Sequence, residues 1–209
     1  KLWENIRRKA EEGRRTGVGI TAEGDMLAAL GLTYGTDTAN EFATEVHKTL
    51  AIEAYRSSVN MAKERMPFMI YDSQREKNNP FIERLRQADP EMVREMENYG
   101  RRNISLLTIA PTGTTSLMTQ TTSGIEPVFR PFYTRRRKVN PNDPEVRVDF
   151  VDEQGDKWEE YKVFHHKFLT WLQINKYDVE EVKNMSNDQV EELVKKSPYY
   201  KATAADIDY

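Results

Sequence analysis

The sequence has no cysteine among its 209 residues. This absence excludes disulfides and thiolate metal sites within the chain. No apolar run approaches the ~20 residues that a membrane-spanning helix needs. No signal peptide is recognisable, and the chain starts at Lys1 rather than at methionine, which suggests a cut from a longer chain. We therefore expect no metal site and no membrane partner.

The sequence also lacks a large excess of charge of either sign, because the net charge is only −3. Global electrostatics therefore give no support to a nucleic-acid partner. The length fits one domain or slightly more. With 38% hydrophobic and 31% charged residues and a mean hydropathy of −0.78, we expect a modest core under charged helices.

One stretch, Asn103–Phe129, is unusually rich in residues that approach ligands rather than fill a core. An apolar run, Ile104 to Ala110, is expected to form a buried strand that ends at Pro111, since proline cannot continue a ladder. The hydroxyl-rich segment Thr112–Ser116 follows, and a second cluster of small residues runs from Thr119 to Gly124.

The segment after the strand has the chemistry of an anion site. Gly113 can adopt positive φ and bring the backbone close to a ligand. Thr114 or Ser116 can cap a following helical turn, whose free N–H groups and dipole favour negative charge. The segment is not a Walker A loop, because the Gly-Lys-Ser/Thr ending is missing. A plain strand-to-helix turn with hydroxyl caps remains the alternative.

The segment NISLLTIAPTGTTS, followed by TTSGIEPVF, resembles the substrate-phosphate loop of the ribonucleotide reductase large subunit, most of all the adenosylcobalamin-dependent class II type. Arg14–Ile20 running into Asp25–Gly31 is similar to the family's strand and helix before that loop. Ser197–Tyr200 and Asp206–Asp208 also resemble the family, whereas residues 140–185 are the least specific part.

The resemblance implies an α/β, helix-rich fold: part of a ten-stranded α/β barrel with a β-hairpin insertion. It divides the chain into residues 1–139, a partial catalytic barrel with the phosphate loop 111–116, residues 140–185, a hairpin plus helix insertion, and residues 186–209, a helix that leads back to the barrel. The radical-cysteine loop and the last barrel strand are expected outside this chain, which would be an internal fragment.

The resemblance also implies the site. The phosphate-binding residues would be Pro111, Thr112, Gly113, Thr114, Thr115 and Ser116. Gly124 and Glu126 would order the loop, with Glu126 accepting backbone N–H bonds. No catalytic residue is expected in this chain, because the reductase radical resides on a cysteine.

The implied reaction replaces the ribose 2′-hydroxyl by hydrogen through a thiyl radical, with adenosylcobalamin as cofactor. The implied partners are the ribonucleotide substrate, the remainder of the reductase chain and a thioredoxin-type reductant, and the implied location is the cytoplasm. A non-catalytic helical interaction module derived from the family is the alternative that the missing cysteines leave open.

Periodicity and capping residues predict the remaining elements. Helices are expected over 2–13, 21–30 with Thr21 as cap, and 39–65 with a capping box from Thr38. Two more are expected with Asn79 and Asp89 as caps before Pro80 and Pro90. The last three are expected over 163–174, over 179–184 with Asp178 as cap, and over 187–196 with a capping box from Ser186 to Gln189. A strand is expected over 17–21 and a hairpin around Gln154–Asp156. The buried stripe of the longest helix should be Phe42, Val46, Leu50, Ala54 and Met61.

Several polar residues are expected to be structural rather than functional. Asp25 should be a solvated or capping acid, and His47 a packed or surface histidine. His165 and His166 are adjacent on a predicted helix, so they make a poor chelate, and their replacement should leave stability nearly unchanged. The aromatic and basic run 129–138 should pack its rings and leave its charges in solvent rather than bind nucleic acid.

Overall fold

The computed structural model describes residues 1–140 and 146–207, and the chain divides into two compact units. Unit 1 consists of Lys1–Ile20 and Asn40–Pro111, and unit 2 of Thr21–Ala39 and Thr112–Tyr209. The division into 1–139, 140–185 and 186–209 stays a prediction about the whole barrel. Residues 141–145, near the start of the predicted insertion, lie outside the described residues.

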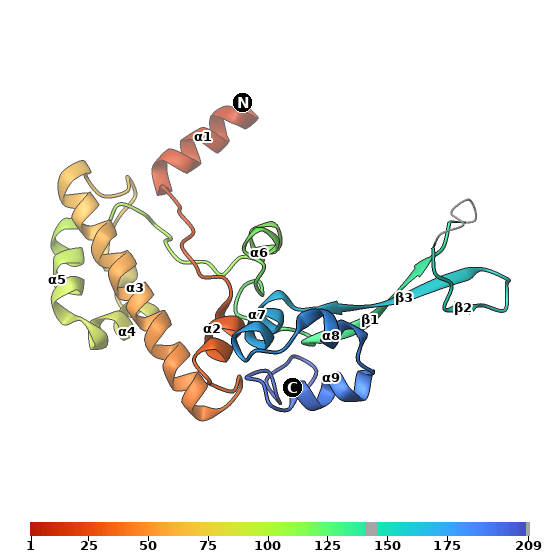
Figure 1. Cartoon of the computed structure of the whole chain (residues 1–209). Coiled ribbons are helices and arrows are strands. Elements are labelled where there is room, and N and C mark those ends of the chain that lie inside the picture. Colours follow the sequence, from red (N-terminus) through yellow and green to blue (C-terminus); the bar gives the residue numbers. More distant parts are fainter. Residues whose placement is uncertain (141–145, 208–209) are drawn as a thin grey trace. The chain divides into compact units, whose positions relative to one another are not determined.

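The described residues are rich in helix and carry one small sheet (Figure 1). The helices are α1 Leu2–Gly13, α2 Glu23–Ala29, α3 Asp37–Arg65, α4 Pro80–Ala88, α5 Pro90–Tyr99, α6 Gly113–Thr119, α7 His166–Ile174, α8 Val179–Asn184, α9 Asn187–Val194 and the short 3₁₀ helix η1 Ser73–Glu76. The strands are β1 Phe132–Lys138, β2 Phe150–Val151 and β3 Lys157–Phe164. No helix among the described residues is both long and apolar enough to span a membrane.

The core of unit 1 lies where α3, α4 and α5 meet. Asn79 and Asp89 cap α4 and α5 through their side chains, and a proline follows each cap, as predicted. Gly100 ends α5 at φ 73°. The buried side chains that these helices share are Tyr55, Val59, Ile82, Leu85, Met92, Val93 and Met96.

The predicted buried stripe of α3 is only partly right, since Val46, Leu50 and Ala54 are merely half-buried. Phe42 is 38% exposed and Met61 is 37% exposed, whereas Tyr55, Val59 and Ala62 are buried. Successive steps of four residues advance by about 40° around a 3.6-residue helix, so the stripe that we predicted drifts off the core face. The helix also begins two residues earlier than expected: the Ala39 N–H donates to Thr36 Oγ1 at 3.4 Å, so the capping box at Thr38 is wrong.

Two extended segments of unit 1 pair in parallel, as neighbouring barrel strands would. The Val18 N–H donates to the Leu106 carbonyl at 2.7 Å, and the Thr108 N–H donates to the Val18 carbonyl at 3.0 Å. The pairing is one isolated bridge rather than two full strands, and Ile109 is 40% exposed. The buried strand expected over 104–110 is therefore only partly present, because a parallel strand needs neighbours on both edges to be buried. A ten-stranded barrel is not established by these residues.

The sheet of unit 2 is antiparallel, with strand order β1-β3-β2 (Figure 1). Phe150 pairs with Trp158 across the predicted hairpin, and Gly155 takes φ 84° in its turn. Phe164 pairs with Phe132 and is buried, so β3 occupies the first residues of the helix that we expected over 163–174. The helix instead starts at His166, because cross-strand pairing outweighs its local helical pattern.

Three of the four basic side chains of β1 form ion pairs with acids on or next to β3. Arg136 pairs with Glu160 at 2.7 Å, Arg137 with Glu159 at 2.5 Å and Lys138 with Asp156 at 2.5 Å. Phe132 is buried as expected, but Phe129 is 69% exposed and Tyr133 46% exposed, so only part of the aromatic run packs.

The core of unit 2 is built by α7, α8, α9 and the segment after them. Asp178 caps α8, and Ser186 with Gln189 forms the capping box of α9, both as predicted. The fully buried side chains Phe168, Leu172, Val182 and Val190 join the helices. This core supports the buried polar groups on which the candidate site depends.

Candidate functional site

The predicted phosphate loop folds as the first turn of α6. The helix begins at Gly113, and Thr112 is its N-cap residue without a side-chain capping bond. The expectation that Thr114 or Ser116 caps the helix is therefore wrong, since both lie inside it. The first backbone bond of the turn joins the Ser116 N–H to the Thr112 carbonyl at 2.8 Å. The N–H groups of Gly113, Thr114 and Thr115 have no acceptor within the described residues, as at any uncapped helix start.

The hydroxyl groups of the loop divide into two kinds. Ser116 is 8% exposed and donates to the Gly113 carbonyl at 2.8 Å, so its hydroxyl is occupied within the helix. The Thr112 hydroxyl accepts from the Gly124 N–H at 3.2 Å. Thr114 and Thr115 are exposed, and their hydroxyls have no partner in the part of the chain that the structure describes. Of the four loop hydroxyls, only these two are free to meet a ligand.

Gly113 does not have the conformation that we predicted for it. It has helical φ, and a Cβ built on it would have no atom within 4 Å outside its own helix turn. Positive φ occurs instead at Gly124, at 57°. The conformational need for glycine therefore lies in the turn that follows α6.

Gly124 and Glu126 differ in their hydrogen bonds near the loop. Gly124 donates its N–H to Thr112, and its carbonyl accepts from the Glu23 N–H at 3.3 Å. Glu126 is exposed, and its carboxylate accepts no hydrogen bond among the described residues. Its predicted role as an acceptor of backbone N–H groups is therefore without support from these contacts.

A short chain of hydroxyls joins the N-cap of α6 to the entry of α2. The Thr21 and Thr112 hydroxyl oxygens lie 2.7 Å apart, and the Thr21 hydroxyl donates to the Thr122 carbonyl at 3.3 Å. Because Thr21 gives its proton to that carbonyl, Thr112 is the donor between the two hydroxyls. Thr21 therefore acts between two segments of unit 2, and it does not cap α2 as we expected: the N-cap is Ala22, at φ 67°.

Asp25 is a buried carboxylate with three donors, so the expectation of a solvated acid is wrong. It is 6% exposed. Its Oδ2 accepts from the Thr122 N–H at 2.8 Å, and its Oδ1 lies 2.9 Å from the Tyr199 hydroxyl and 2.7 Å from His165 Nε2. Burial alone raises the pKa of this carboxyl, but the bonds from His165, Thr122 and Tyr199 outweigh burial and hold the pKa below its ordinary value.

The other two side chains of this cluster are fixed by the same carboxylate. Burial, together with the charge of Asp25, raises the pKa of Tyr199, so its hydroxyl stays a donor. The side chain of His165 is 12% exposed, and it lies just before α7 rather than on it. Because His165 contacts a buried carboxylate, we now expect its replacement to lower stability, whereas His166 is exposed. No group of three or more His, Asp or Glu that could hold a metal occurs among the described residues.

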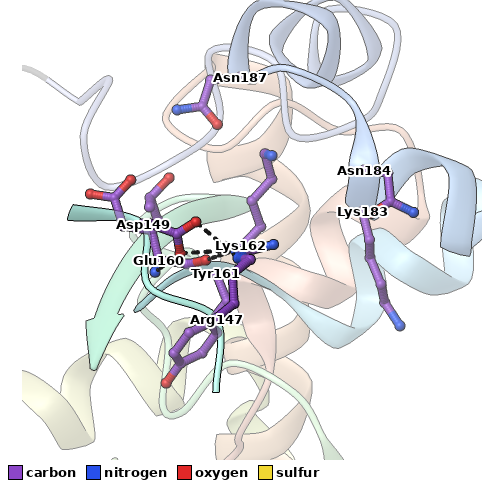
Figure 2. Close-up of a pocket in the computed structure, with 9 residues that line it drawn as sticks. Arg147, Asp149, Glu160, Tyr161, Lys162, Lys183, Asn184 and Asn187 are labelled. Atoms are coloured by element: carbon purple, nitrogen blue, oxygen red, sulfur yellow. Dashed lines mark hydrogen bonds and ion pairs between the residues drawn. The ribbon is translucent and has the colours of Figure 1, made fainter. Parts of the chain in front are cut away.

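A separate polar hollow of about 450 Å³ lies between the sheet and the α8–α9 region (Figure 2). Figure 2 shows Lys183 and Asn184 across the hollow from Asp149 and Glu160. Arg147 pairs with Asp149 at 2.9 Å, and Lys183 pairs with Glu180 at 2.6 Å. Arg147 and Lys183 are therefore already paired within the chain.

The family assignment rests on a match over nearly the whole chain. The sequence model of the family described as "Ribonucleotide reductase, barrel domain" matches residues 2–209. The chain belongs to this family. The recognition made from the segments 103–129 and 14–31 is thereby confirmed, and the parallel pairing of 16–18 with 105–108 fits a barrel segment.

The matching reductases cover different shares of the chain. The vitamin B12-dependent ribonucleoside-diphosphate reductase of Mycobacterium tuberculosis (strain CDC 1551 / Oshkosh) is 32% identical over 60% of this chain and 16% of its own length. The protein of the same name from Thermoplasma acidophilum is 28% identical over 92% of this chain and 21% of its own length. Ribonucleoside-diphosphate reductase subunit alpha of Treponema pallidum is 23% identical over 60% and 15%. The chain thus spans about a fifth or less of these reductases.

Sequence reasoning found the loop but missed the residues that hold it. Thr21, His165 and Tyr199 come from distant parts of the chain, and each looks ordinary in its local context. One usable signal was present: Asp25 is an acid beside an otherwise apolar helical run, MLAAL, that must pack.

Proposed function

We propose that this chain is the part of a ribonucleotide reductase catalytic subunit that binds the substrate phosphates, with the first turn of α6 as the clamp. The proposal rests on a group of hydrogen-bond donors at the start of α6 that have no acceptor within the described residues. Three successive N–H groups, of Gly113, Thr114 and Thr115, lack acceptors within the described residues, and the two threonine hydroxyls beside them are exposed. Such a set suits phosphate oxygens.

The residues of the loop take different roles in this proposal. Thr114 and Thr115 donate through backbone and side chain, and Gly113 donates through its N–H. Thr112 and Ser116 hold the turn, because their hydroxyls are occupied by Gly124 and by the Gly113 carbonyl. Pro111 shapes the approach, and Gly124 supplies the left-handed residue of the following turn.

The loop would contribute by positioning the substrate and would take no part in the reaction itself. The phosphate does not react when the ribose 2′-hydroxyl is replaced through a thiyl radical, so holding it fixes the ribose relative to the radical. The radical cysteine must come from the remainder of the reductase chain, because this chain has none. A thioredoxin-type reductant and a cytoplasmic location belong to the same proposal.

The names of the relatives indicate the cofactor. Three of the matching reductases are named vitamin B12-dependent, so we propose adenosylcobalamin for the complete enzyme. The contacts described above assign no residue of this chain to the corrin.

The test is the double variant Thr114→Val with Thr115→Val, made in the complete reductase. It keeps β-branched side chains in the first turn of α6 and removes only the two free hydroxyls. Hydrogen bonds to a charged group contribute about 1.5–3 kcal/mol each, so KM for the nucleotide should rise at least tenfold. Thr170→Val is the control, since that exposed hydroxyl donates to the His166 carbonyl on α7.

An unchanged KM in the double variant would contradict the clamp. Absence of any nucleotide binding by the parent enzyme would favour the alternative, a non-catalytic interaction module derived from the family.

A further inference from the structure

The phosphate-binding turn is not held by its own helix. α6 has no side-chain cap, and it is only seven residues long, so its start needs support from elsewhere. The nearest support is the turn at Thr122–Gly124, whose Gly124 N–H donates to Thr112 Oγ1. Whatever fixes this turn also fixes the N-cap of α6.

The turn at Thr122–Gly124 is fixed by residues 21–25, on and just before α2. Three hydrogen bonds join the two segments. The Thr21 hydroxyl donates to the Thr122 carbonyl at 3.3 Å, the Thr122 N–H donates to Asp25 Oδ2 at 2.8 Å, and the Glu23 N–H donates to the Gly124 carbonyl at 3.3 Å. Two of the three depend on side chains and so can be removed by substitution.

Thr21 has a second contact, directly with the loop. Its hydroxyl oxygen lies 2.7 Å from that of Thr112, which is the N-cap residue of α6. One hydroxyl therefore touches both ends of the connection, Thr112 before α6 and Thr122 after it.

Asp25 is itself immobilised from the other side. Its Oδ1 is held by His165, which precedes α7, and by Tyr199, in the segment after α9. Both residues rest against the aromatic core of unit 2, with Tyr199 edge-on to Phe168 at 6.2 Å between ring centroids. The carboxylate thus links the turn at 122–124 to the buried core of the unit.

We propose that Thr21 and Asp25 are positioning residues that preorganise the phosphate-binding turn of α6. The effect on substrate rests on the proposed function, whereas the effect on the turn does not. Holding the turn in its bound shape before the ligand arrives removes an ordering cost from binding. Loss of the Thr21 hydroxyl should therefore weaken nucleotide binding through the shape of the turn.

The first experiment measures amide hydrogen exchange by NMR in the 209-residue chain, without ligand. Thr21→Val removes the hydroxyl and keeps the shape, Thr21→Ser keeps the hydroxyl, and Thr170→Val is the control. Thr21→Val removes two neutral hydrogen bonds, and the loss of either one already implies that the Gly124 amide exchanges at least roughly threefold faster. Parent-like exchange of Gly124 in Thr21→Val would overturn the proposal.

The second experiment measures KM and kcat in the complete reductase. Thr21→Val should raise KM several-fold and leave kcat at saturating nucleotide nearly unchanged, because bound phosphate orders the turn again. Thr21→Ser should restore KM. A lower melting temperature with unchanged KM would show a merely structural role and overturn the proposal.

The two proposals fail in different ways. If Thr114→Val with Thr115→Val leaves KM unchanged, the clamp is wrong, and the positioning of a phosphate site is wrong with it. If that double variant raises KM and Thr21→Val does not, the clamp stands and the role of Thr21 is overturned.

Discussion

At the scale of single residues, two glycines near the candidate site have opposite requirements. Gly124 has φ 57°, where an alanine costs about 1–2 kcal/mol. Gly113 has helical φ and open space around its Cβ position, so alanine there should stabilise the chain by up to about 1 kcal/mol. We expect Gly124→Ala to lower the melting temperature and Gly113→Ala to leave it unchanged or raise it.

Thermal unfolding of the two glycine variants, followed by circular dichroism, checks this expectation. A lower melting temperature for Gly113→Ala alone would contradict it. If Gly113→Ala keeps its stability but loses nucleotide affinity, the loss comes from crowding of the ligand rather than from the backbone.

Asp25 makes a pH-dependent contribution to stability. Its pKa lies below the ordinary value of 3.8, so its stabilising effect is fully present at neutral pH and is lost as pH falls below about 4 through the folded pKa. Asp25→Asn should lower the free energy of unfolding at pH 7 by about 2 kcal/mol, because the bonds of a buried charged acceptor are lost.

Urea unfolding at pH 7, 4 and 3 measures this effect. The difference between the parent chain and Asp25→Asn should shrink as the pH is lowered, because Asp25 then becomes protonated. Glu126→Gln, which removes an exposed carboxylate without a hydrogen bond among the described residues, is the control and should leave stability unchanged. A difference that stays constant from pH 7 to pH 3 would contradict a lowered pKa for Asp25.

At the scale of elements, the start of α5 depends on one side chain with two contacts. Asp89 Oδ1 accepts from the Met92 N–H at 3.0 Å, and Oδ2 pairs with Arg56 of α3 at 2.5 Å. Asp89→Ala loses the cap and the ion pair and should cost about 1–2 kcal/mol. Asp89→Asn keeps a capping oxygen and should cost less than about 1 kcal/mol, since partly exposed ion pairs contribute little.

Denaturant titration of the two Asp89 variants separates the cap from the ion pair. Equal losses in Asp89→Ala and Asp89→Asn would mean that the pair with Arg56, and not the cap, holds α5.

At the scale of the whole molecule, the purified 209-residue chain should form no deoxynucleotide when adenosylcobalamin and a dithiol are added. The reason is the absence of any cysteine to carry the thiyl radical. The complete reductase in the same assay is the positive control. Deoxynucleotide formation above background by this chain would overturn the roles assigned to it.

Features that depend on neighbours along the chain could be predicted without the tertiary structure. The caps at Asn79, Asp89, Asp178 and Ser186 are of this kind, because a side-chain oxygen meets N–H groups two or three residues away. The hairpin turn at Gly155 and the family resemblance of the loop are local in the same sense.

The residues that hold the candidate site emerge only when the chain is folded. Asp25 meets Thr122, His165 and Tyr199 across separations of 97, 140 and 174 residues, and no local pattern encodes such a meeting. The start of α7 was likewise set by the pairing of Phe164 with Phe132 rather than by helical periodicity. Burial removes water as an alternative partner, so a buried carboxylate takes whatever donors packing brings to it.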